Sequence, residues 1–224
     1  MERYKRNGIF TEHEMNIIKN SNVCIVGCGG LGGYILEMLS RIGIGKITII
    51  DGDVFEKSNL NRQILATTQT IGKIKVKEAG KRIFKVNPNV QITMIHDFLN
   101  EDNIDIIIKK FDVVIDALDS IKTRILLQKK CEEENIPLVH GAIAGWFGQV
   151  TTIMPGDRTL DRLYPKDLNK GIETEIGNPS FTPGLVASLE VSEVIKVILK
   201  KEELLRNKML YIDLLDNEFQ VIDI

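Results

Sequence analysis

The glycine-rich segment at residues 27–32 (GCGGLG) constrains the fold of this chain more than any other part of its sequence. It follows a short apolar run at residues 23–26 (VCIV), and after it apolar residues recur at helical spacing. A strand, a G-x-G-x-x-G turn and a helix form a nucleotide-binding βαβ unit, because the turn lets the backbone approach the ligand and the helix N-terminus attracts anions. Asp51 ends the next β-branched run, roughly 20 residues further on, where such units place an acid that binds ribose. We therefore expect a nucleotide site built from Asp51 and the glycines of the turn: Gly27, Gly29, Gly30 and Gly32.

The first two thirds of the sequence alternate between strand and helix patterns. Further strands are expected at residues 46–50, 90–95, 112–116 and 138–141, and further helices at residues 73–86, 103–109 and 120–135. This alternation predicts an α/β, doubly wound, Rossmann-like fold with a mainly parallel sheet.

The pattern changes after Gly145. A strand at residues 149–154 leads into a polar stretch, a long helix at residues 183–200, and short strands at residues 209–214 and 219–222. Because a turn at Asp216-Asn217 joins the last two strands, we expect antiparallel C-terminal strands at the edge of the sheet. No repeat, low-complexity tract or linker divides the chain, so we interpret residues 1–224 as a single domain with an N-terminal helical segment at 1–20 and a mobile crossover-type loop at 155–178.

The composition is typical of a protein with one core. A chain of 224 residues with 43% hydrophobic content can bury such a core, and its 29 basic and 31 acidic residues indicate no general attraction to nucleic acid or membrane. No run approaches the roughly 18 apolar residues of a spanning helix, and the N-terminus has no apolar signal core, which predicts a cytoplasmic protein. The cysteines Cys24, Cys28 and Cys131 form no CxxC pair and are expected to be free thiols.

Polar and basic residues follow Asp51: Asp53, the run at residues 58–63 (SNLNRQ) and Lys75. Transfer of a phosphoryl group requires positive charge near the phosphate oxygens and the departing pyrophosphate, which Arg, Lys and Mg²⁺ supply. No G-x-x-x-x-G-K-[ST] sequence occurs, which excludes an ordinary P-loop. These side chains favour ATP over NAD, although the glycine turn alone fits both nucleotides.

The glycine turn, the D-x-D at residues 51–53, the S-N-x-x-R-Q at residues 58–63 and Lys75 together resemble the ThiF/MoeB/HesA family, bacterial relatives of the ubiquitin-activating enzymes. The similarity extends over nearly the whole chain, from residues 3–7 (RYKRN) through residues 141–149 (GAIAGWFGQ) to the helix near the C-terminus. It implies an ATP-dependent adenylyltransferase that acts on the C-terminal glycine carboxylate of a small ubiquitin-like sulfur-carrier protein ending in Gly-Gly. It also implies a homodimer.

The resemblance assigns roles to individual residues. Arg6 would reach the triphosphate of the partner subunit, Asp51 would bind the ribose hydroxyls, and Asp119 would hold Mg²⁺. Asn59, Arg62 and Lys75 would contact phosphates, Arg124 matches a basic residue of the family, and Asp53 and Gln63 are lesser matches. The expected catalytic residues are therefore Arg6, Arg62, Lys75 and Asp119. The competing interpretation of Asp119 is that it caps the following helix.

Two departures from the family pattern change the expectations. Many members bind structural zinc through paired CxxC motifs, whereas this chain has no cysteine after Cys131, so we expect no zinc site. The loop at residues 155–178 also lacks the cysteine with which some relatives form a thioester or persulfide, so this chain should stop at the adenylate or pass it to another thiol source. Because a carboxylate is already ionised at neutral pH, adenylate formation needs no protein nucleophile, and the histidines are interpreted as structural or surface residues.

The sequence leaves further functions open. A ThiF-like enzyme could activate a different carboxylate, such as that of a peptide, or a modified tRNA base, although the balanced charge disfavours tRNA. A non-catalytic nucleotide-binding partner and an NAD-binding Rossmann oxidoreductase would also contain a glycine turn of this kind. The sequence does not distinguish among carriers of the thiamine, molybdopterin, tungsten-cofactor, cysteine or other pathways.

Overall fold

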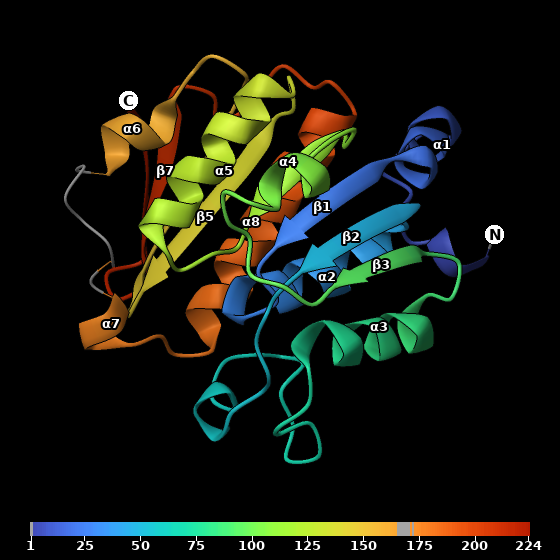
Figure 1. The fold of residues 1–224 in the computed structure, drawn as a ribbon. Coiled ribbons are helices and arrows are strands. Elements are labelled where there is room, and N and C mark those ends of the chain that lie inside the picture. Colours follow the sequence, from blue (N-terminus) through green and yellow to red (C-terminus); the bar gives the residue numbers. More distant parts are fainter. Residues whose placement is uncertain (1, 165–170, 172) are drawn as a thin grey trace.

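The computed structural model describes residues 2–164, 171 and 173–224, and these residues form a sheet with helices on both faces (Figure 1). The strands are β1 (Asn22–Val26), β2 (Lys46–Ile50), β3 (Gln91–Ile95), β4 (Val113–Asp116), β5 (Leu138–Ala144), β6 (Phe147–Ile153), β7 (Lys208–Asp213) and β8 (Glu218–Asp223). The helices are α1 (Glu12–Asn20), α2 (Gly30–Ile42), α3 (Lys75–Val86), α4 (Ile104–Ile107), α5 (Ile121–Glu133), α6 (Thr159–Leu163), α7 (Glu173–Ile176) and α8 (Phe181–Ile198), with the 3-10 turns η1 (Glu2–Tyr4) and η2 (Lys57–Asn59).

The strand order is β3-β2-β1-β4-β5-β6-β7-β8. β1 pairs in parallel with β2 on one side and with β4 on the other, and β3 and β5 continue the parallel sheet outward. From β5 to β8 every pairing is antiparallel. The predicted fold class, doubly wound and mainly parallel with antiparallel C-terminal strands, is confirmed.

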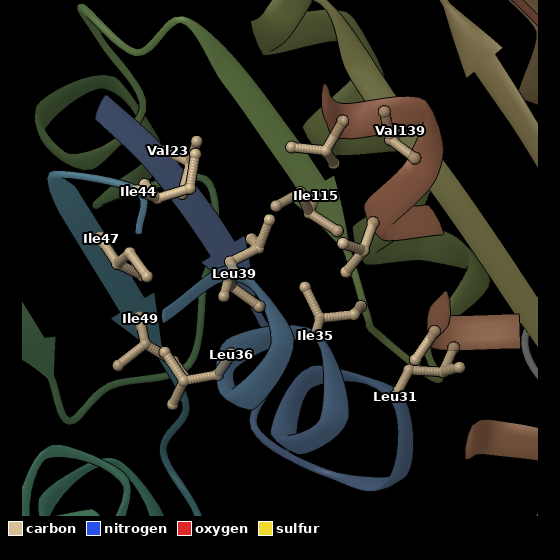
Figure 2. Packing of buried hydrophobic residues seen from close by; sticks show 14 of the residues in the cluster. Val23, Leu31, Ile35, Leu36, Leu39, Ile44, Ile47, Ile49, Ile115 and Val139 are labelled. Atoms are coloured by element: carbon tan, nitrogen blue, oxygen red, sulfur yellow. The ribbon is translucent and has the colours of Figure 1, made fainter. Parts of the chain in front are cut away.

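The core lies between the sheet and the helices on each face. Figure 2 shows the largest part of it, where Ile35, Leu36 and Leu39 of α2 pack beneath the apolar side chains of neighbouring strands. The strand residues labelled there are Val23, Ile47, Ile49, Ile115 and Val139. A second cluster covers the other face under α4 and α5, so strands in the middle of the sheet are buried on both sides and read as continuous apolar runs.

The region from β5 to β6 differs from the prediction. β5 continues to Ala144 and β6 begins at Phe147, so the two strands form one long hairpin where the sequence predicted strands only at residues 138–141 and 149–154. The glycines of this region suggested strand ends. Gly141 instead lets α8 lie against the sheet, because a Cβ there would come 2.3 Å from the Glu190 carboxyl carbon.

The predicted boundaries also shift around α8. This helix begins at Phe181 rather than Pro183, because proline is tolerated in a first turn, where backbone N–H groups have no helical partner. The segment at 155–178 contains α6 and α7, which its polar sequence did not indicate. Part of the segment that the sequence predicted to be mobile, residues 165–170 and 172, lies outside the described residues. Among the described helices, none is both long and apolar enough to cross a membrane.

Candidate active site

A cavity opens at the carboxyl ends of β1, β2, β3 and β4, where the strand order reverses between β1 and β4. Open α/β sheets bind ligands at such a reversal, because the loops on its two sides diverge to opposite faces. The lining residues that the sequence had singled out are Gly27, Gly29, Gly30, Asp51, Asp53, Arg62, Gln63, Lys75, Asp119 and Arg124. The topology thus brings together side chains that are spread over nearly half of the chain.

The glycine turn divides into structural and ligand-facing positions. Gly27 has φ +101°, and a Cβ on Gly32 would come 1.9 Å from the Gly27 carbonyl oxygen, so both glycines are required for the close approach of α2 to β1. Gly32 does not line the cavity, whereas Gly29 and Gly30 do. The first turn of α2 carries no acidic side chain, so its N-terminus presents backbone N–H groups and a positive dipole end to the cavity.

The Asp51 carboxylate holds the backbone on two sides of the cavity. One oxygen accepts from the Cys28 N–H at 2.7 Å and the other from the Asp53 N–H at 2.8 Å. Each carboxylate oxygen retains further acceptor capacity, so Asp51 can bind a hydroxyl of a ligand while it fixes the glycine turn. The sequence predicted the ligand contact and missed this structural role.

Lys75 and Arg62 provide positive charge on one wall. The Lys75 side chain is 7% exposed, and its Nζ lies 2.9 Å from an Asp53 carboxylate oxygen. Arg62 donates from one guanidinium nitrogen to Ser58 O and Asn61 Oδ1, each at 3.0 Å. The Lys75–Asp53 ion pair means that an incoming anion competes with Asp53 for this ammonium group.

The neighbouring Gln63 is buried, and its Oε1 has no hydrogen-bond partner among the described residues. A buried acceptor without a partner is costly, and this one lies on the wall of the cavity, where a donor on a ligand could satisfy it.

Asn59 and Arg6 do not line the cavity of their own chain. Asn59 is buried, and its Oδ1 accepts from the Glu56 N–H at 3.0 Å, so its side chain caps η2. Arg6 is exposed on the N-terminal segment, which lies near α1 and β3 in Figure 1. Asn7 fixes this segment to the end of α2 by donating to Ile42 O at 3.1 Å.

Asp119 lies in the loop between β4 and α5, exposed at the cavity. Ser120, not Asp119, caps α5, since its hydroxyl accepts from the Thr123 N–H at 3.3 Å. Within the described part of the chain, the Asp119 carboxylate makes no hydrogen bond or ion pair, and no group of three or more His, Cys, Asp or Glu side chains is placed to hold a metal ion.

The cysteines and His140 are buried and therefore poor nucleophiles or acids. Burial raises the pKa of the Cys24, Cys28 and Cys131 thiols. Burial also lowers the pKa of His140, although its neighbour Asp116 acts in the opposite direction. These side chains are protonated thiols and a neutral imidazole at neutral pH, which agrees with their interpretation as structural residues.

Sequence reasoning missed the part of the wall contributed by the loop after β3, which contains Asp97, Phe98 and Leu99. Phe98 is 61% exposed, and its ring lies so close to Gly52 that a Cβ there would come within 2.6 Å of it. No motif identifies this loop. The signal that could have found it is topological, since β3 is a parallel strand whose carboxyl end reaches the same edge of the sheet.

A groove over β5, β6 and β7 lies next to this cavity. Arg124 and Ile143 line both hollows, so they stand at the junction. The rest of the groove wall is Ala142, Ala144, Phe147, Gly148, Gln149, Tyr164, Gly171 and Tyr211. The molecule therefore presents a pocket with charged and apolar walls beside a mostly apolar groove.

The fold and this cavity define an α/β protein of the nucleotide-binding type, with Arg62, Lys75 and Arg124 in the wall beside its glycine turn. The chain belongs to the ThiF family, whose sequence profile matches residues 4–224. The family membership expected from the motifs is confirmed.

Named relatives agree with this assignment. The chain is 32% identical to the SAMP-activating enzyme E1 of Haloferax volcanii over 228 residues, covering 99% of this chain and 84% of that protein. It is 32% identical to the molybdopterin-synthase adenylyltransferase of Escherichia coli over 206 residues, covering 88% of this chain and 82% of that protein. The predicted reaction class, adenylyl transfer, is the one that the second name states.

Solved structures agree with the fold. Escherichia coli MccB, solved with ATP, superposes with a TM-score of 0.82 at 24% identity, covering 100% of this chain and 71% of MccB. At this identity the likeness concerns the fold alone.

Proposed function

We propose that this protein transfers the adenylyl group of ATP to the C-terminal glycine carboxylate of a small ubiquitin-like sulfur-carrier protein, with release of pyrophosphate. The observation that carries the proposal is that the two hollows adjoin and share Arg124 and Ile143 in their walls. The first hollow suits a nucleotide, and the second suits the extended end of a polypeptide. The Arg124 guanidinium lies in the wall that they share. The names of the relatives from Haloferax volcanii and Escherichia coli support the same reaction class.

ATP fits the first hollow. The α2 N-terminus, Arg62 and Lys75 offer positive charge to the triphosphate, Asp51 offers acceptors to the ribose, and Gln63 offers an unsatisfied acceptor. Asp119 suits Mg²⁺, because its carboxylate is exposed at the cavity and protein-bound Mg²⁺ commonly has only one or two carboxylate ligands besides substrate phosphates. When bound, Mg²⁺ neutralises charge on the phosphate oxygens.

The second hollow suits the C-terminus of a polypeptide. Its wall is mostly apolar, so it would hold an extended tail by shape and leave the terminal carboxylate to meet Arg124 at the junction. A carboxylate oxygen then attacks the α-phosphorus as the bond to the β-phosphate oxygen breaks, giving an acyl adenylate and pyrophosphate. No proton is transferred, so the protein mainly aligns two anions and neutralises their repulsion.

We further infer that the whole chain acts as one domain in a cytoplasmic homodimer. Arg6 is exposed and fixed away from the cavity of its own chain, which is the arrangement expected if it serves the partner's site.

The test is ATP–pyrophosphate exchange with each small ubiquitin-like protein of the same genome that ends in Gly-Gly. Exchange should require the carrier and Mg²⁺ and should disappear when the carrier lacks its last glycine. Stabilisation by NADH alone, with no exchange for any carrier, would instead favour the oxidoreductase. Exchange driven by a short peptide or a tRNA would favour activation of another substrate.

A further inference from the structure

A buried hydrogen-bonded cluster lies beneath the junction of the two hollows. His140 and Asp116 are each 0% exposed at the side chain, and His140 Nδ1 lies 2.8 Å from Asp116 Oδ2. On its other side, His140 Nε2 lies 3.0 Å from the hydroxyl of Tyr164, the residue that follows α6. The same hydroxyl accepts from Arg124 at 2.8 Å and from the Gln149 amide nitrogen at 2.9 Å.

The donors and acceptors of this cluster determine where its protons lie. Arg124 and the Gln149 amide nitrogen can only donate, so they occupy the lone pairs of the Tyr164 oxygen. The Tyr164 hydroxyl lies 3.0 Å from His140 Nε2, and we assign its proton to this contact, with Nε2 as the acceptor. The Gln149 amide nitrogen lies 3.3 Å from the same Nε2 and can only donate, so this contact also requires His140 Nε2 to be an acceptor. His140 is consequently neutral and protonated on Nδ1, from which it donates to Asp116. Burial lowers the pKa of His140, in agreement with this assignment.

The cluster determines the position of Arg124. Besides its bond to Tyr164, the guanidinium donates twice to Leu118 O, at 3.1 Å from Nε and at a shorter separation from Nη2. Asp116 fixes the same loop, since its Oδ1 accepts from the Leu118 N–H at 3.0 Å. The guanidinium is thus held between Leu118, next to the proposed Mg²⁺ ligand Asp119, and Tyr164 on the groove wall.

We propose that His140 and Tyr164 are positioning residues for adenylyl transfer: His140 accepts the Tyr164 proton, and the oriented hydroxyl holds Arg124 where the acyl carboxylate and the α-phosphate meet. This inference rests on the proposed function. Tyr164 directly follows α6 and lines the groove, so the same bond holds the end of α6 beside it.

A double-mutant cycle tests the inference. Tyr164→Phe removes one oxygen, and His140→Asn removes the acceptor at the Nε2 position. Each should lower the maximal rate of carrier-dependent exchange by roughly 10- to 100-fold, the effect of a small misplacement of a reacting group. The double variant should be little worse than either single variant, because both changes break the same interaction. ATP affinity should change little, because the glycine turn, Asp51 and Lys75 are untouched.

His140→Gln is the matched control, since its amide oxygen can accept near the position of Nε2 and should restore much of the rate lost in His140→Asn. Nitrogen NMR of the wild-type protein gives a readout that needs no variant to fold. One of the three histidines should be a neutral Nδ1–H tautomer.

Additive losses of rate, loss of ATP affinity in parallel with rate, or an Nε2–H tautomer of His140 would each overturn the inference while the proposed function stands. No exchange by the wild-type protein with any Gly-Gly carrier would overturn both.

Discussion

Two buried glutamates on α8 should respond oppositely to the same substitution. Glu190 is 0% exposed, and neither carboxyl oxygen has a hydrogen-bond partner among the described residues. Burial raises its pKa well above the ordinary 4.5, with a further increase from Asp116 that the Arg124 cation opposes. The carboxyl group is therefore protonated in the folded protein over a range of pH in which it is ionised in the unfolded chain.

The sign and size of the effect follow from proton linkage. Because the folded pKa is raised, the stability contributed by Glu190 is fully present below about pH 4.5 and is lost as the pH rises toward the folded pKa. Where only the folded state binds this proton, the free energy of unfolding falls by about 1.4 kcal/mol for each unit by which the pH rises. Glu190→Gln keeps the shape and removes the titration. Its free energy of unfolding should exceed that of the wild type by an amount that grows with pH above about 4.5, by up to about 1.4 kcal/mol per pH unit, until the pH reaches the raised folded pKa.

Glu193, one turn further along α8, is the matched control. It is 2% exposed and accepts from Thr152 Oγ1 at 2.5 Å and from the Leu205 N–H at 2.9 Å, and it pairs with Lys196. Glu193→Gln should therefore destabilise the fold by about 2 kcal/mol at pH 7. Urea denaturation of both variants and the wild type at pH 5, 6 and 7 makes the comparison. If the curves for Glu190→Gln and the wild type run parallel over this range, Glu190 is ionised in the folded protein and the reasoning is wrong.

Four further predictions concern the site. Arg62→Ala should lower exchange by about 100-fold without changing the thermal midpoint, since the hydrogen bonds of its side chain to described residues go to Ser58 and Asn61 of its own loop; near-normal exchange would refute its phosphate role. Phe98→Ala should weaken ATP binding by roughly tenfold through lost base stacking while Phe98→Tyr does not, as titration calorimetry would measure; equal affinities would exclude stacking. Mixing inactive Arg6→Ala with inactive Lys75→Ala chains should restore about a quarter of wild-type exchange if Arg6 acts across a dimer, and no recovery after subunit exchange would contradict this. Elemental analysis should find no stoichiometric zinc and chelation should not unfold the protein; one zinc per chain would contradict the cysteine argument.

The sequence predicted the parallel part of the fold well because two local signals agreed there. The glycine turn has a fixed spacing, and doubly buried strands appear as apolar runs between amphipathic helices. The β5–β6 hairpin was underestimated because its glycines mark contact with α8 rather than strand ends. A close approach between elements distant in sequence leaves no periodic pattern.

The sequence predicted the site residues that belong to a recognisable motif. Of the proposed phosphate ligands, Arg62 and Lys75 lie at the cavity, whereas Asn59 caps η2 instead. Phe98 and Tyr164 belong to no motif, since loops after a strand and after a short helix can carry many residues. They come to the site only because the sheet order brings those loops to one edge.

The Lys75–Asp53 ion pair explains how a buried ammonium group can line the cavity and still be available to an anionic ligand. A buried ammonium without a partner would be costly, and Asp53, which is 53% exposed at the side chain, supplies that partner at 2.9 Å. A phosphate that takes over Lys75 need only displace a carboxylate that water can solvate, so the exchange of anions costs little. A neutral ligand could not replace Asp53 in this way. The pair therefore favours anionic ligands before any contact with the base or ribose is made.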